Sequence, residues 1–123
     1  MRRAWLAAAA VGGFFSVAAG GAAAHLGAGE RVAELLRTGA LYGIVHAAAL
    51  IAVTGVAEIR ARPDFGLIIA GWSFAGGMML FSFSLFALAL TDIRWLGLVT
   101  PVGGLGLLAG WAALGLHAVL RRR

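Results

Sequence analysis

The chain has 123 residues, of which 62% are hydrophobic and only 12% are charged. A mean hydropathy of +0.95 excludes a soluble globular domain, because a domain of this size cannot bury so large a share of its chain. The absence of cysteine excludes disulfides and thiolate metal sites, and the net charge of +5 does not indicate nucleic-acid binding, since the arginines stand at the ends of apolar segments.

Four stretches without a charged residue make up most of the sequence. Each is long enough to cross a bilayer core, which needs about 20 apolar residues of α-helix. The sequence therefore predicts an all-α membrane protein, a four-transmembrane-helix bundle. It forms a single transmembrane domain over 1–123, with helices at about 4–25, 38–58, 65–90 and 101–120.

The first predicted helix carries small residues on one face. Gly12, Ser16, Ala19 and Ala23 recur at helical spacing, which lets a neighbouring helix approach closely. The arginines at positions 2 and 3, the apolar run and the alanines at 22–24 are also typical of a secretory signal with a cleavage site. Because the run is long for a signal core, we expect a membrane helix; cleavage is the alternative that the sequence leaves open.

The next segment joins the first two spans. The glycines at 27 and 29 end the first helix. Residues 30–37 alternate charged and apolar side chains, so we expect a separate short amphipathic helix lying in the membrane interface. In the span that follows, Gly39 and Gly43 form a GxxxG pair, which predicts a close helix contact.

The last two spans also carry small residues at helical spacing. Proline is favoured at the first position of a helix, so we place the start of the fourth helix at Pro101; a kink in a longer helix is the alternative. The complete set of predicted helix-packing residues is Gly12, Ser16, Gly39, Gly43, Gly77, Gly103, Gly106 and Gly110.

The arginines are distributed unevenly between the two sides of the predicted bundle. One side holds Arg2, Arg3, Arg60, Arg62, Arg121, Arg122 and Arg123, and the other holds Arg31, Arg37 and Arg94. The positive-inside rule then predicts cytoplasmic N- and C-termini. Trp5 and Trp95 stand at span ends, and we expect them to anchor the chain at the membrane interface.

The four uncharged stretches leave histidines as their only readily ionisable residues. Charged groups inside a membrane usually mark ion or proton pathways. The absence of Asp, Glu, Lys and Arg from the four stretches therefore argues against a proton-coupled transporter. All three histidines, His25, His46 and His117, lie on small-residue faces and are expected to point into the bundle. The candidate polar cluster consists of His25, Tyr42, His46 and Ser84.

Two interpretations of the histidines remain open. His25 and His46 could form a ligand pair for haem or a metal, or the histidines could form a proton relay. The simpler interpretation is that each histidine hydrogen-bonds a backbone carbonyl or a side chain of a neighbouring helix. We favour the second, and predict no catalytic residue, no metal site and no cofactor.

Several motifs occur together in one order. They are residues 21–25 (GAAAH), Tyr42 with His46 and Ala47, Gly71 with Trp72, residues 81–86 (FSFSLF), residues 100–104 (TPVGG), and Gly110 with Trp111. In this order and spacing they resemble the YgdD-like family, small four-helix membrane proteins of bacteria with relatives in animal mitochondria. The family usually has glycine at position 83 and tyrosine at 86, where this chain has Phe83 and Phe86. The resemblance implies the fold and a bacterial inner membrane, but no established reaction.

We expect a non-enzymatic accessory or assembly subunit that packs against a larger membrane complex, such as a respiratory or other energy-converting one. The reasons are the small-residue faces, the uncharged spans and the short loops. One alternative is a small homo-oligomeric transporter or channel for a neutral or lipophilic solute, with a cavity lined by Ser73, Ser84, Tyr42 and His46. The other is a haem- or quinone-binding redox protein that uses His25 and His46.

Overall fold

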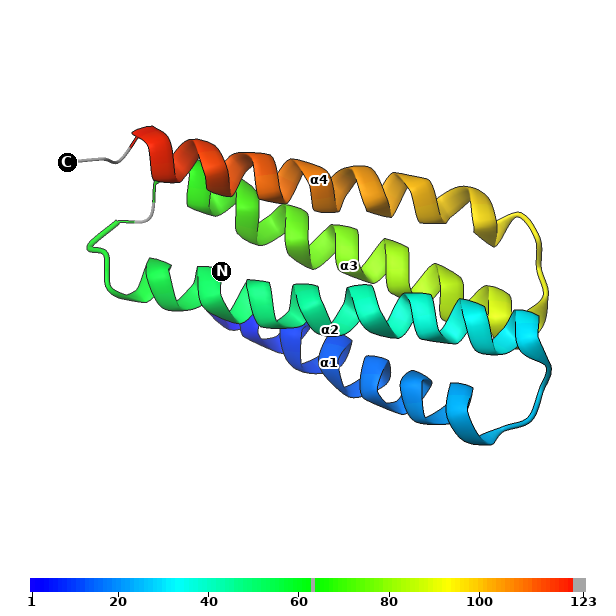
Figure 1. The fold of residues 1–123 in the computed structure, drawn as a ribbon. Coiled ribbons are helices and arrows are strands. Elements are labelled where there is room, and N and C mark those ends of the chain that lie inside the picture. The colour runs from blue at the N-terminus through cyan, green and yellow to red at the C-terminus, as the bar shows by residue number, and fades with distance from the viewer. Residues whose placement is uncertain (63, 121–123) are drawn as a thin grey trace.

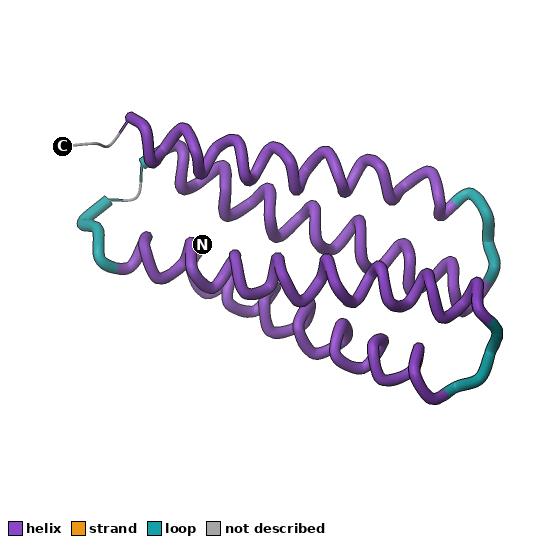
Figure 2. The backbone as a smooth tube through the Cα atoms, in the orientation of Figure 1, coloured by secondary structure: helices purple, strands orange, loops and turns teal. Residues whose placement is uncertain are grey.

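The protein is a bundle of four α-helices that run up and down (Figure 1). The computed structural model describes residues 1–62 and 64–120. Arg121, Arg122 and Arg123, which were predicted to lie on the cytoplasmic side, fall outside this part. The helices are α1 Arg2–His25, α2 Glu30–Glu58, α3 Phe65–Thr91 and α4 Leu96–Leu120. Short loops join them at the two ends of the bundle, and the described residues form no strand (Figure 2). All four helices are long and apolar enough to cross a membrane, which confirms the predicted fold.

The segment 30–37 is helical, but it forms the first turns of α2 and not a separate interfacial helix. The helix continues without a break from Arg37 into Gly39, and Arg37 forms an ion pair with Glu34, three residues earlier, at 3.0 Å. Leu36 is 3% exposed and packs in one cluster with Phe86 of α3. The amphipathic pattern therefore belongs to a helix end that is packed on one side and charged on the other.

The fourth helix begins at Leu96, so the predicted start at Pro101 was wrong. Its first turn is closed by short-range bonds such as Leu98 N–H to the Trp95 carbonyl at 2.9 Å. Pro101 lies just beyond that turn, where its missing N–H deprives only one carbonyl, that of Gly97, of its helical partner. Proline near the start of a helix is tolerated for this reason.

Helix α3 is the central helix of the bundle. It contacts all three others, whereas α1 packs mainly on α2, and α4 packs on α3 (Figure 1). The largest fully buried side chains come from the first three helices: Trp5, Leu50, Val53, Leu67, Phe74 and Met78. Because α4 is attached through α3, the space between α2 and α4 is left open to the side.

All of the small residues singled out for packing lie against another helix. The closest approach joins α3 and α4. A Cβ added to Gly77 would stand 2.7 Å from the backbone nitrogen of Leu107 and 2.9 Å from the carbonyl oxygen of Gly103. These atoms belong to the backbone and cannot turn away, so only glycine permits the two helices to lie this close.

Trp5 is a core residue and not the expected interfacial anchor. Its side chain is 0% exposed and lies against Gly71, where an added Cβ would overlap the indole ring. The ring also makes an edge contact with Trp72, with centroids 6.1 Å apart. Gly71 provides the space for the indole ring, and the sequence pattern did not indicate that these two residues meet. Trp95, in contrast, is 62% exposed.

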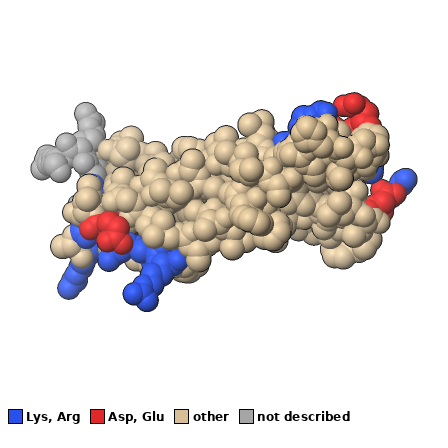
Figure 3. Space-filling model, turned by 90° about the horizontal axis from the view of Figure 1, so that it is seen from below, with Lys and Arg blue, Asp and Glu red and all other residues tan. Residues whose placement is uncertain are grey.

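Charged side chains gather at the two ends of the bundle and leave an uncharged middle on the face seen in Figure 3. At one end, Arg2 pairs with Glu58 at 3.0 Å and also donates to the Ala57 carbonyl at 3.2 Å. At the other end, Arg31 pairs with Asp92 at 3.0 Å. These exposed pairs add little stability in water, but they tie helix ends together across the bundle.

Substitution of Gly103 tests the α3–α4 contact. We expect Gly103→Ala to lower the free energy of unfolding by about 1–3 kcal/mol, because the new Cβ meets the backbone of Phe81. Gly115→Ala on the same helix is the matched control, since an added Cβ there meets nothing within 4 Å. Unfolding in mixed SDS–maltoside micelles, monitored by circular dichroism, measures both. Equal stability of the two variants would contradict this packing.

Candidate functional site

A lateral groove of about 640 Å³ opens between α2 and α4. It exists because both helices pack on α3 and not on each other. Its walls are almost entirely apolar, and Tyr42 and Trp111 at its rim are 43% and 45% exposed, so it opens to the outside of the bundle. Its lining residues are Tyr42, His46, Phe81, Pro101, Gly104, Leu105, Leu107, Leu108 and Trp111.

His46 lies at the inner wall of the groove and is 5% exposed. Its Nδ1 is 2.7 Å from the Tyr42 carbonyl oxygen, which can only accept, so Nδ1 carries the proton. The other nitrogen, Nε2, then accepts a hydrogen bond from the indole N–H of Trp111 at 2.9 Å. His46 is therefore a neutral link between α2 and α4, and both of its ring nitrogens are occupied.

Aromatic rings surround this hydrogen bond. The rings of Tyr42 and His46 are parallel within 5°, and Phe81 lies 4.6 Å from the Tyr42 ring. Phe74 contacts the rings of both His46 and Trp111, at 5.6 and 4.9 Å between centroids. These five residues, here called the aromatic cluster, join three helices. Gly110 makes room for Phe74, since an added Cβ would lie 2.6 Å from that ring.

The structure brings together only part of the candidate polar cluster. Tyr42 and His46 are neighbours, whereas Ser84 lies between α3 and α4, where its hydroxyl shares a 2.6 Å hydrogen bond with that of Thr100. His25 does not point into the bundle as expected; it is exposed at the end of α1. In the last turn of α1, Ala22 and Ala23 pack partly against α2 and α3, whereas His25 lies on the exposed side.

The structure does not support a ligand pair of His25 and His46. Because α2 already begins at Glu30, His46 lies roughly 24 Å along the helix axis from that end of the bundle. No group of three or more metal-ligating side chains occurs among residues 1–62 and 64–120. Within that part of the chain, nothing brings a second ligand to His46.

The other buried hydroxyl groups of the described residues do not hydrogen-bond to one another. Thr54 donates to the carbonyl of Leu50 in its own helix at 2.7 Å. Ser82 of α3 donates to the carbonyl of Gly39 in α2 at 2.8 Å, so it links two helices. Ser16 is fully buried against Gly43 and makes no hydrogen bond to the described residues. These groups are separate contacts and do not form a continuous polar route.

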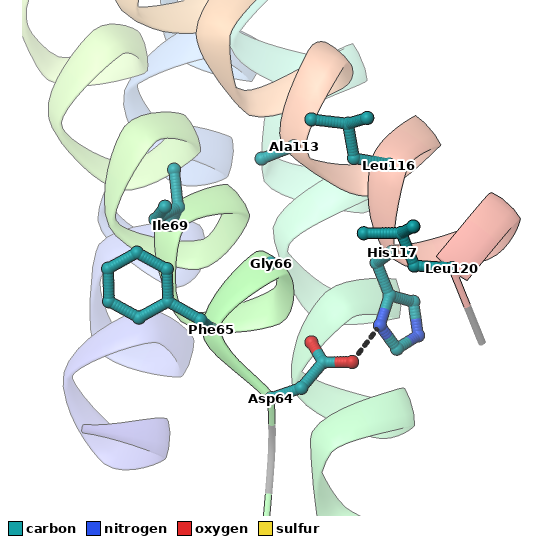
Figure 4. Close-up of a pocket in the computed structure, with 8 residues that line it drawn as sticks. All are labelled: Asp64, Phe65, Gly66, Ile69, Ala113, Leu116, His117 and Leu120. Carbon is teal, nitrogen blue, oxygen red and sulfur yellow. Dashed lines mark hydrogen bonds and ion pairs between the residues drawn. The ribbon is translucent and has the colours of Figure 1, made fainter.

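A second polar pair lies at the end of the bundle that holds Arg2 (Figure 4). Asp64 accepts a hydrogen bond from the backbone N–H of Leu67 at 3.0 Å, so it caps α3, and its other oxygen is 2.6 Å from Nδ1 of His117 on α4. His117 is 8% exposed, and an apolar pocket of about 360 Å³ lies beside the pair. The sequence patterns described above did not predict this pair. An aspartate directly before an apolar run is a helix-capping signal, and it could have placed Asp64 next to the end of α4.

The chain is similar to a family of membrane proteins. The profile of the family described as protein of unknown function (DUF423) matches residues 19–104. The UPF0382 inner membrane protein YgdD of Escherichia coli strain K12 is 37% identical over 123 residues, covering 94% of this chain and 88% of the relative. The UPF0382 membrane protein YwdK of Bacillus subtilis strain 168 is 32% identical over 90 residues, covering 73% and 72%.

A shorter match is found with the UPF0382 membrane protein SH2409 of Staphylococcus haemolyticus. It is 44% identical over 73 residues, which cover 59% of this chain and 57% of the relative. No solved structure shows a significant match. The matches confirm the resemblance to YgdD that was drawn from the motifs.

The hydrogen bond between α2 and α4 can be tested by a double-mutant cycle. Trp111→Phe keeps an aromatic ring but removes the donor to His46, so we expect a loss of about 1–3 kcal/mol from the unpaired buried acceptor. Combined with His46→Leu, the cycle should give a coupling energy near 0.6 and below about 1.7 kcal/mol, the range found for such bonds in membranes. A coupling energy of zero would show that the contact is not a hydrogen bond in the membrane.

Substitutions of Asp64 separate its two contacts. Asp64→Asn keeps an acceptor for the Leu67 N–H but weakens the pairing with His117, whereas Asp64→Ala removes both. We expect the alanine variant to be less stable than the asparagine variant by about 1 kcal/mol, the value of a helix N-cap. The mixed-micelle unfolding assay measures this difference. If both variants were equally stable, the capping role would be refuted.

Proposed function

We propose that this protein is a non-enzymatic accessory subunit of a larger membrane assembly. The chain belongs to the DUF423 family of proteins of unknown function, and the proposal proceeds from that membership. The protein is an integral membrane protein with four candidate spans. Its role in this proposal is to pack side by side with another integral membrane protein. The names of its relatives specify a membrane or inner membrane and no reaction.

The observation that carries the proposal is the outer face of α1. This helix buries only one stripe against α2 and α3, and its opposite side is exposed. That exposed side presents the small residues Ala7, Ala10, Ala18 and Gly21, beside the larger Phe14 and Val17, which are 70% and 66% exposed. An added Cβ at Gly21 would meet nothing within 4 Å. In a membrane, small residues favour close contact with another helix, whereas a lipid-facing surface has no need of them.

The interior gives less support to a transporter or channel. Transport of a solute would need a cavity lined by polar groups, and the expected one included Ser73 and Ser84. In the described part of the chain, the groove contains Tyr42 and His46 but neither serine. It opens sideways to lipid and does not pass through the bundle. Where Gly77 meets Gly103 and Leu107, the backbones of α3 and α4 touch, so no path passes between the two helices at that level.

We further propose that the protein lies in a bacterial inner membrane, with the start of α1 and the end of α4 on the cytoplasmic side. The start of α1 and the end of α4 lie at the same end of the bundle (Figure 1). That end carries Arg2, Arg3, Arg60 and Arg62, and the positive-inside rule favours the cytoplasm for such a cluster. The name of the Escherichia coli relative, an inner membrane protein, supports the choice of membrane.

The accessory role predicts that the protein migrates with a larger complex. Native membranes solubilised in a mild detergent, at native expression level, would be separated on a native gel and analysed by mass spectrometry. We expect Gly21→Leu to release the protein from the complex, because the bulky side chain blocks the outer face of α1. Gly115→Leu on α4 is the matched control, since that position is equally open, and it should leave the complex intact. A wild-type protein that migrates alone as a monomer would refute the proposal.

A further inference from the structure

The hydroxyl of Tyr42 is in an unusual position. Tyrosine in membrane proteins is enriched at the interfaces, where its hydroxyl reaches water. Tyr42 instead lies inside the uncharged part of α2, five residues beyond Arg37, and it is 43% exposed at the groove. Its hydroxyl makes no hydrogen bond within residues 1–62 and 64–120. An unpaired hydroxyl in hydrocarbon is unfavourable, so its position indicates a partner that enters the groove.

The groove has the size and walls of a site for a flat molecule. Its volume of about 640 Å³ lies within the range of small-molecule sites, about 300–1,000 Å³. Phe81 and Trp111 present ring surfaces to it, and Gly104 leaves its wall free of a side chain. Aromatic walls of this kind suit a planar ring, which stacks on them or meets them edge-on.

The depth of the groove restricts the chemistry of the partner. Most of the residues that line it lie in the middle part of α2, α3 and α4, and only Pro101 lies near a helix end, so the groove opens from the central part of the bundle. Phospholipid ester carbonyls stay near the interface, roughly 15 Å from the midplane of a ~30 Å core, and acyl chains carry no acceptor. The partner of Tyr42 must therefore be a lipophilic molecule whose own polar atoms can lie in hydrocarbon.

We propose that the groove binds the ring of a lipophilic quinone, with the Tyr42 hydroxyl donating to a quinone carbonyl oxygen. The ring would lie against Phe81 and Trp111, and its hydrophobic tail would pass over Leu105 and Leu108 into the lipid. His46 would not contact the quinone; it positions Trp111 through the 2.9 Å hydrogen bond. The proposal concerns binding and includes no electron transfer. It uses no residue of α1, so it is independent of the accessory role.

The test uses the full chain in nanodiscs of phosphatidylcholine without quinone. Decylubiquinone, a quinone with a ten-carbon tail, is titrated and its binding is measured as saturable quenching of tryptophan emission, with empty nanodiscs as the blank. We expect Tyr42→Phe, which removes only the hydroxyl, to weaken apparent affinity about 3- to 10-fold, the usual effect of one hydrogen bond. Decylbenzene, which has the tail and ring without carbonyls, should not displace the quinone.

Two glycine variants on α4 show whether binding takes place in the groove. Gly104→Leu fills it and should abolish saturable quenching, whereas Gly115→Leu, outside the groove, should leave it unchanged. Quenching that does not saturate, equal affinity of wild type and Tyr42→Phe, or displacement by decylbenzene would each overturn the proposal. So would efficient disulfide or bismaleimide cross-linking of Tyr42→Cys to another protein in native membranes, because the groove would then be a protein contact. Gly21→Leu should not alter quinone binding, which keeps this test separate from that of the accessory role.

Discussion

The fold depends on how closely the other helices approach α3. In a membrane the hydrophobic effect does not drive helices together, because lipid is as apolar as the side chains; close van der Waals contact must do so. Glycines supply that contact at Gly71 with Trp5, at Gly77 with Gly103, and at Gly39 with Phe86. Each removes a Cβ from a position where another helix or a large ring fills the space. The central place of α3 follows from these contacts.

The same packing explains why the bundle has an open side. Because α4 is bound so tightly to α3, it is held away from α2, and the groove lies between them. The hydrogen bond from Trp111 to His46 crosses this gap. A neutral imidazole suits that position, since it can donate to a carbonyl of its own helix and accept from the opposite helix at once. The histidine that looked like a candidate ligand is thus a link between helices.

Sequence patterns predicted the membrane class and the small-residue faces well, because both depend on composition and local spacing. They failed where a neighbouring helix decides the outcome. The position of Trp5 at a span end predicts an interfacial residue, but Gly71 of another helix provides a space for its ring in the core. The charged pattern of residues 30–37 reads as a separate helix, but Leu36 packs with Phe86 and holds the segment in line with α2. His25 was expected to share the packed face of α1, yet its side chain lies on the exposed side of the last turn.

The sequence by itself determined that this is a four-helix membrane protein with its charges at the ends and glycines at its helix contacts. Helical periodicity and the thickness of a bilayer require that much. Only the tertiary structure decided which side chains meet: Trp111 with His46, Asp64 with His117, and Tyr42 with an open groove. The residues that form each of these contacts are far apart in the sequence, so whether they meet depends on which helices are neighbours. In a chain of similar apolar helices, that order comes from the fit between glycines and large side chains, which no single segment contains.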